Sequence, residues 1–233
     1  MTLVDVFHHS VQPVAAEKLR AIVVNDIRWM YDTFPDVRKV SRAALGPDVY
    51  ITLKEKYDPL LHFGNFNLTT SRTLAYELIW KWTEATGKYV GCPFWSENAK
   101  ALFDTEVSSA GGWPIQPALA KKIAKRLSEK GANEEKSVPK AKLTHEHVYP
   151  IKDMKRRLYS YAERSIEEIR GLFDRYCVGC VVLESEHNQL SVEGDDTNHW
   201  VRYAEAGIKL APNPAWPDSQ RRMIVAAGLL NEK

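Results

Sequence analysis

The sequence predicts an α+β protein with a mainly helical N-terminal region, and three observations support this. Apolar residues recur every three or four positions in several segments before residue 131, which is the spacing of a helical face. After residue 142, short apolar stretches have the character of strands. A polar stretch without periodicity lies between the two patterns. We therefore expect a helical region at 1–130, a linker at 131–142 and a second domain at 143–233.

The composition sets the broad class of protein. Of the 233 residues, 44% are hydrophobic and 27% are charged, which is typical of a soluble globular chain. No apolar run approaches the roughly 18–20 residues that a membrane helix needs, so we expect a cytoplasmic protein without a membrane partner. The net charge of +2 gives no global attraction for a polyanion, and three cysteines are too few for a disulfide framework.

The N-terminal region is predicted to contain helices separated by proline and glycine breakers. Pro35 and Gly87 end two of them, and Gly131 follows the last. A strand is predicted at Val49–Leu53, because β-branched and aromatic side chains alternate behind Gly46-Pro47. The predicted helices are at residues 14–34, 71–87, 97–103 and 117–130.

The C-terminal domain is predicted to alternate strands and helices. A strand leads into the turn at Pro150, and a second strand covers Cys180–Leu183. Ser185 is predicted to cap a short helix after that strand. The other predicted helices are at residues 153–173, 198–207 and 219–230.

The triplet His145-Glu146-His147 is the most informative motif in the sequence. Hydrolysis of a phosphodiester needs a base that deprotonates water and a cation that stabilises the charge on phosphate, and an acid next to an imidazole can supply both. On a strand, neighbouring side chains point to opposite faces, so a shared site requires a bulge or bend before Pro150.

A second cluster, Glu184-Ser185-Glu186-His187-Asn188, begins a predicted helix after a strand. Together the two motifs resemble the HNH nucleases of the ββα-metal class, over about 50 residues. The resemblance implies a C-terminal ββα-metal-like module and a metal-dependent DNA endonuclease of restriction or phage type. It implies His147 as the general base, Glu146 as the strand-side metal ligand and His187 or Asn188 as the helix-side ligand. The implied cofactor is Mg²⁺ or Mn²⁺.

The match to the family is partial. The family usually has an aspartate where this chain has Glu146, and a shorter connection between the two strands. It also has an asparagine that orients the base, whereas no asparagine occurs between Val148 and Glu186. His145 has three alternative roles: it binds metal, contacts phosphate or faces water.

Two basic stretches flank the histidine motif. Such side chains neutralise phosphates without reading the base sequence, so we expect DNA as the partner, with RNA not excluded. The alternative for the second stretch is that Lys155 to Arg157 only face solvent on a helix. The residues are Lys121, Lys122, Lys125 and Arg126 before the motif, and Lys152, Lys155, Arg156 and Arg157 after it.

Other interpretations stay open at this stage. Cys177 and Cys180 have the spacing of half a structural zinc site, but buried free thiols are the favoured interpretation because a zinc site needs four ligands. The alternatives to a nuclease are a non-catalytic nucleic-acid-binding protein and a tryptophan-rich adaptor or inhibitor that binds another protein. A homodimer is also left open.

Overall fold

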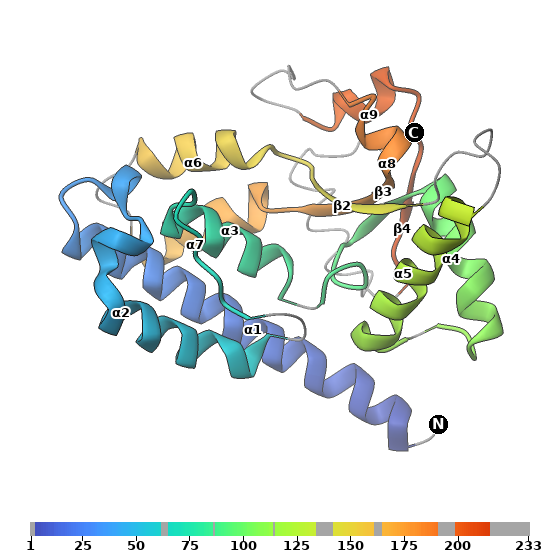
Figure 1. Ribbon diagram of the computed structural model, residues 1–233, viewed down its shortest axis with the longest axis horizontal. Coiled ribbons are helices and arrows are strands. Elements are labelled where there is room, and N and C mark those ends of the chain that lie inside the picture. The colour runs from blue at the N-terminus through green and yellow to red at the C-terminus, as the bar shows by residue number, and fades with distance from the viewer. Residues whose placement is uncertain are drawn as a thin grey trace. The chain divides into compact units, whose positions relative to one another are not determined.

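The computed structural model describes residues 3–61, 65–85, 87–113, 115–133, 142–160, 165–190 and 199–214. Helices make up most of this chain, and four strands form one mixed sheet, so the predicted α+β class is confirmed (Figure 1). None of the described helices is both long enough and apolar enough to cross a membrane.

The chain folds as two compact units that interleave in sequence. One, the helical unit, combines residues 1–87 with 149–177, and the other, the sheet unit, combines residues 88–148 with 178–233. The predicted linker at 131–142 is largely outside the described residues, and the predicted division there stays a prediction.

The helical unit is built on the long helix α1, which ends at Thr33 ahead of Pro35, as the sequence predicts. Ala16, Leu19, Val23, Ile27 and Met30 are buried, because they fall on one face of the helix. Trp82 of α3 packs against Phe173 of α7 with ring centroids 5.1 Å apart. The helices of this unit are α1 (Leu3–Thr33), η1 (Val37–Lys39), α2 (Arg42–Tyr57), η2 (Asp58–Leu60), α3 (Leu74–Thr83), α6 (Ile151–Tyr159) and α7 (Ile166–Tyr176).

The predicted strand at Val49–Leu53 is wrong, because these residues lie within α2. Gly46 has a φ of 73°, which kinks the helix, and Pro47 follows as the start of a new helical segment. Proline is favoured in a first turn because its fixed φ suits the helix and its missing N–H leaves no bond unmade. The buried residues Tyr50, Leu53 and Tyr57 then follow a helical spacing that the local alternation hides.

The single helix predicted at 153–173 is also wrong, since the structure has two helices there, α6 and α7. Ser165 caps α7 by accepting a hydrogen bond from the backbone N–H of Glu168, whose side chain bonds back to the Ser165 N–H. This capping box starts a new helix within a continuous apolar pattern.

The sheet unit contains the four strands found among the described residues, in the order β2-β3-β1-β4. β2 and β3 are antiparallel, β1 and β3 are parallel, and β1 and β4 are antiparallel. The predicted strand at Cys180–Leu183 is confirmed as β3. The elements are β1 (Phe94–Ser96), α4 (Glu97–Ser109), α5 (Pro117–Asn133), β2 (Leu143–His147), β3 (Gly179–Leu183), α8 (Glu184–His187), α9 (Val201–Glu205) and β4 (Leu210–Pro212).

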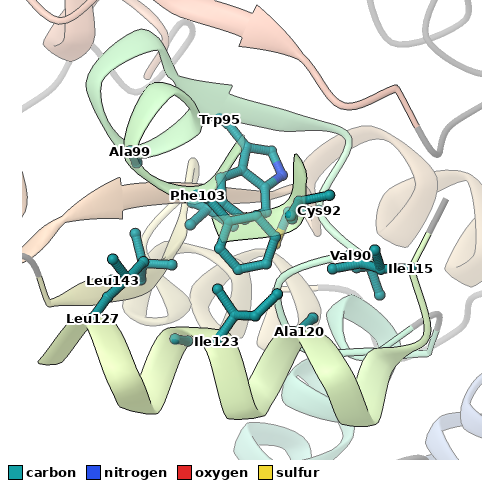
Figure 2. Packing of buried hydrophobic residues seen from close by; sticks show 13 residues of the cluster. Val90, Cys92, Trp95, Ala99, Phe103, Ile115, Ala120, Ile123, Leu127 and Leu143 are labelled. Atoms are coloured by element: carbon teal, nitrogen blue, oxygen red, sulfur yellow. The ribbon is translucent and has the colours of Figure 1, made fainter. Parts of the chain in front are cut away.

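An apolar core lies between one face of this sheet and the helices α4 and α5 (Figure 2). Trp95 of β1 and Phe103 of α4 are fully buried at its centre, with ring centroids 4.7 Å apart. Ile123 of α5 and Leu143 of β2 contribute to the same cluster. The side chains of β2 that share a face with Leu143 are therefore directed toward this core.

One predicted helix end and one predicted helix start differ from those in the structure. Helix α5 continues to Asn133, so Gly131 does not end it. The helix predicted at 198–207 is present as α9 and begins later, at Val201, whereas its end is confirmed, because Gly207 follows it with a φ of 67°. The helix predicted at 219–230 lies outside the described residues.

Candidate functional site

The strand β2 is regular, and this decides where its three polar residues point. Its register with β3 is unbroken from Leu143 opposite Leu183 to His147 opposite Gly179. Because side chains alternate along a strand, His145 and His147 share one face, and Glu146 lies on the other. The bulge or bend that would bring Glu146 and His147 together does not occur within β2.

Glu146 is the centre of a charged cluster on its own face of the sheet. One carboxylate oxygen, Oε2, is 2.7 Å from Nδ1 of His187 in α8, and the other, Oε1, is 2.8 Å from Nη2 of Arg202 in α9. Burial alone would raise the pKa of Glu146, but the hydrogen bonds from His187 and Arg202 outweigh it and hold the pKa below its usual range. The carboxylate is therefore ionised at neutral pH.

His187 is the exposed member of this cluster. The hydrogen bond to Glu146 raises the pKa of its imidazole above the usual value. Its side chain is 44% exposed, whereas that of Arg202 is 3% exposed. Glu146 thus links a buried guanidinium to an imidazole that solvent can reach.

Helix α8 is held in place by its own buried acid, Glu186. The Glu186 carboxylate accepts hydrogen bonds from the Ser96 hydroxyl, from Nδ2 of Asn98 at 2.9 Å and from the backbone N–H of Leu183 at 2.9 Å. These contacts join the first turn of α8 to the start of α4. The position of the adjacent His187 therefore depends on a satisfied buried network.

Arg202 is the residue of this site that sequence reasoning missed. Trp200, just before α9, packs against Phe94 of β1 with ring centroids 5.2 Å apart, and Tyr203 is also buried. Trp200 and Tyr203 are three residues apart, a spacing that suits one helix face, but no local pattern in the sequence marks the arginine between them. Only the folded sheet brings α9 over Glu146.

The opposite face of β2 carries two buried histidines. His145 and His147 are each 6% exposed, and their rings stack with centroids 5.3 Å apart. Burial lowers the pKa of His147 to about 4 and that of His145 well below its usual value. Both imidazoles are neutral at pH 7, which is the form that a general base requires, but both are directed away from Glu146.

The donor atoms around Glu146 bear on the predicted metal ion. The structure brings two of the three predicted ligands, Glu146 and His187, into direct contact, and Asn188 is exposed at the end of α8. However, both oxygens of Glu146 are taken up, one by the cation Arg202. Within the described ranges, no three His, Cys, Asp or Glu side chains are grouped so as to hold a metal ion. The contacts that Glu146 makes therefore do not fit a divalent cation at this position.

The two predicted basic stretches lie on different units. The basic residues of the first stretch lie on α5, in the sheet unit, and all four are exposed: Lys121, Lys122, Lys125 and Arg126. On α6, in the helical unit, Lys152 and Arg156 are exposed. Lys155 lies 5.9 Å from the ring centroid of Tyr76, and Arg157 lies 4.3 Å from that of Tyr176.

Cys177 and Cys180 are buried free thiols in the structure. Burial raises the pKa of both thiols well above the usual value. Since zinc binds the thiolate, these surroundings favour the interpretation as buried thiols.

Comparison with known proteins gives no family assignment. No protein-family model matches the chain, and no curated protein and no solved structure matches it.

Proposed function

We propose that this protein hydrolyses phosphodiester bonds of nucleic acid at the Glu146–His187 site. One observation carries the proposal: β3, which pairs antiparallel with β2, is followed directly by α8, and His187 of α8 contacts Glu146 of β2. Apart from α6 and α7, which connect the two strands, this is the order of elements that the HNH resemblance implies. The exposed basic residues of α5 lie on the same unit and provide charge for phosphate.

His187 is the residue that transfers the proton in this proposal. Its Nδ1 atom is held by Glu146, so its other ring nitrogen, Nε2, is the atom available to a water molecule. In the hydrolysis, Nε2 accepts a proton from water as the water oxygen bonds to phosphorus. The bond from phosphorus to the leaving oxygen breaks, and that oxygen keeps the electron pair and takes a proton from solvent, while the His187 imidazolium returns its proton to solvent.

Arg202 and Glu146 are positioning residues for this step. The buried guanidinium fixes one carboxylate oxygen, and the other oxygen then fixes the tautomer and orientation of the imidazole. A carboxylate that orients a histidine in this way also stabilises the imidazolium that forms. The predicted roles of His147 as base and of Mg²⁺ or Mn²⁺ as cofactor stay predictions, which a cleavage experiment tests.

A second candidate function is nucleic-acid binding without catalysis. It is favoured by the burial of His145 and His147, whose stacked neutral rings suit a role in packing. The same basic residues would then bind phosphate alone. Cleavage of the nucleic acid distinguishes the two candidates.

The experiment measures cleavage of plasmid DNA and of single-stranded RNA, with Mg²⁺, with Mn²⁺ and with a chelator. We expect His187→Ala to reduce the cleavage rate by about 10²- to 10⁴-fold, the usual contribution of a proton-transferring side chain. Ser185→Ala, which changes an exposed neighbour on the same helix, is the matched control and should keep the full rate.

Three outcomes decide between the assignments. No cleavage of either substrate by the unaltered protein would overturn the proposal in favour of binding alone. Full activity of His187→Ala together with an inactive, folded His147→Ala would return the base to His147. Complete inhibition by the chelator would support the predicted metal cofactor.

A further inference from the structure

Three segments of the helical unit that are distant in sequence meet at one surface. The backbone N–H of Leu74, at the start of α3, donates to the carbonyl of Val40 at 2.7 Å, and Ser41 forms a β-bridge with Thr73. These bonds join the chain after η1 to the start of α3. Helix α6 packs against α3 in the same unit (Figure 1).

The ring of Tyr76 holds two cations from different helices. The guanidinium carbon of Arg72, just before α3, is 4.7 Å from the ring centroid, and Nζ of Lys155 in α6 is 5.9 Å from it. Cations within about 6 Å of an aromatic centroid are attracted by the ring. Tyr76 therefore keeps two positive charges close together that would otherwise repel each other.

Two further cations come from η1, and the carboxylates nearby do not neutralise the set. In the part of the chain that the structure describes, one carboxylate, Asp36, forms ion pairs with both Arg38, at 2.8 Å, and Lys39, at 3.5 Å. The side chains of these two cations are 68% and 83% exposed.

The acid that pairs with Arg72, Glu77, is also shared. Glu77 is buried and lies 3.0 Å from Nζ of Lys81, whereas its distance to Arg72 is 3.8 Å. The cations thus carry a positive excess that is open to solvent.

We infer that Arg38, Lys39, Arg72 and Lys155 form one phosphate-binding surface for the backbone of a nucleic acid. We call it the Tyr76 surface. The assignment of nucleic acid as its partner rests on the proposed function. The inference extends that function, because it gives the helical unit a role in holding the substrate. Three of its four cations, those of η1 and of the segment before α3, lie outside the two basic stretches singled out in the sequence, within the 1–130 region that is predicted as a possible DNA-contacting domain.

The chemistry of the surface favours a nucleic acid over an acidic protein. Stable protein interfaces are centred on buried apolar or aromatic anchors. No large hydrophobic side chain is exposed in the described residues of these three segments, and the one central ring, Tyr76, is engaged by cations. Spaced positive charges without apolar anchors suit a chain of phosphates.

The test measures how the affinity for a DNA duplex changes with salt concentration. All variants are made in the full-length chain carrying His187→Ala, so that the DNA is not cleaved during the binding measurement. We expect the double variants Arg72→Gln/Lys155→Gln and Arg38→Gln/Lys39→Gln each to lower the slope of log affinity against log salt by about 1.8, at roughly 0.9 per phosphate contact. The control Lys18→Gln removes an exposed charge about 22 Å along α1 from Thr33, at 1.5 Å per residue, and should leave the slope unchanged.

A second pair of variants tests the role of the ring. Tyr76→Phe keeps the aromatic face and should bind as the parent protein does, whereas Tyr76→Leu should weaken binding because Arg72 and Lys155 lose their common partner. Melting temperatures identify any variant that fails to fold.

The inference is overturned if both double variants fold and bind DNA with an unchanged slope, or if they lose binding to polyglutamate while binding to DNA is unaffected. A protein that cuts neither DNA nor RNA, but whose DNA affinity falls in these variants, would overturn the proposed hydrolysis and support the Tyr76 surface. Cleavage that depends on His187, with unaffected DNA affinity in the double variants, would do the reverse.

Discussion

The two faces of β2 place three consecutive polar residues in opposite environments. On one face, His145 and His147 stack as neutral rings beside an apolar core. On the other face, Glu146 is ionised between a guanidinium and an imidazole. The alternation of a regular strand therefore separates residues that support packing from residues that carry charge.

The two faces differ in whether hydrogen-bond partners compensate for the burial of a charged group. A buried carboxylate is tolerated where cationic hydrogen-bond donors meet it, as Arg202 and His187 do. On the histidine face, burial is the largest effect and lowers the pKa of both imidazoles, so both rings are neutral at pH 7. This contrast leads to three predictions, ordered from the largest expected effect to the smallest.

The largest effect is expected on the charged face, for Arg202→Met. This change leaves the buried Glu146 carboxylate without its guanidinium, and breaking one side of a buried ion pair costs about 3–5 kcal/mol. Denaturant unfolding measures the loss. The matched control is Arg28→Met, which breaks the exposed pair with Asp32 and should cost less than about 1 kcal/mol.

A double variant sharpens this prediction. Glu146→Leu in the Arg202→Met background removes both charges, so most of the lost stability should return. If the double variant is as unstable as Arg202→Met alone, the loss comes from packing around α9 and not from the carboxylate.

The second effect concerns acid stability, and the two faces should respond with opposite signs. His147 has a pKa of about 4 in the folded protein and about 6.5 when unfolded, so the unfolded state binds more protons between these values. Its contribution is present above pH 6.5 and is lost as the pH falls to 4, by about 3 kcal/mol at 1.4 kcal/mol per pH unit. His147→Gln should reduce this loss of stability in acid.

His187 provides the contrast for that measurement. Its folded pKa is raised, so its stabilising contribution is present at low pH and is lost as the pH rises through the folded pKa. His187→Gln should therefore make the protein more sensitive to acid, and a change in the same direction as His147→Gln would contradict the assignment of the two faces.

The smallest effect is expected for Gly179→Ala, on the histidine face. A Cβ at this position would lie 2.7 Å from Nε2 of His145 and 2.9 Å from Sγ of Cys92. Forcing extra volume into a packed core costs about 1–3 kcal/mol, which denaturant unfolding also measures.

Gly171 in α7 offers a matched control for this substitution, because a Cβ there meets nothing within 4 Å. Gly171→Ala should raise stability by about 0.8–1 kcal/mol, the difference in helix propensity. Equal effects of the two substitutions would show that His145 is not packed closely against β3.

The sequence predicts the elements of this fold correctly where a proline or glycine marks the end of an element and the spacing of its apolar residues is clear. Pro35 ends α1 as expected, and the apolar run at Cys180–Leu183 is a strand. The prediction for Val49–Leu53 is wrong because alternation over five residues cannot be distinguished from part of a helix, and the buried positions of α2 become evident only over the longer span to Tyr57.

The candidate site also has one part that local sequence predicts and another part that depends on tertiary structure. The resemblance of two local motifs is sufficient to predict that Glu146 and His187 lie together. The contact between Arg202 and Glu146 spans 56 residues and depends on the packing of α9, which no local pattern encodes. The burial of His147 likewise depends on which face of β2 meets the core, and that is set by tertiary structure.

The interleaving of the two units has a consequence for synthesis on the ribosome. The helical unit needs residues 149–177, so it cannot be completed until the first strands of the sheet unit have been translated. Strand β2 cannot pair with β3 until β3 has been synthesised, more than 30 residues later. Closing such long loops before any pairing is gained slows folding, so β2 emerges with an unpaired edge, the state in which a nascent strand is most prone to aggregate.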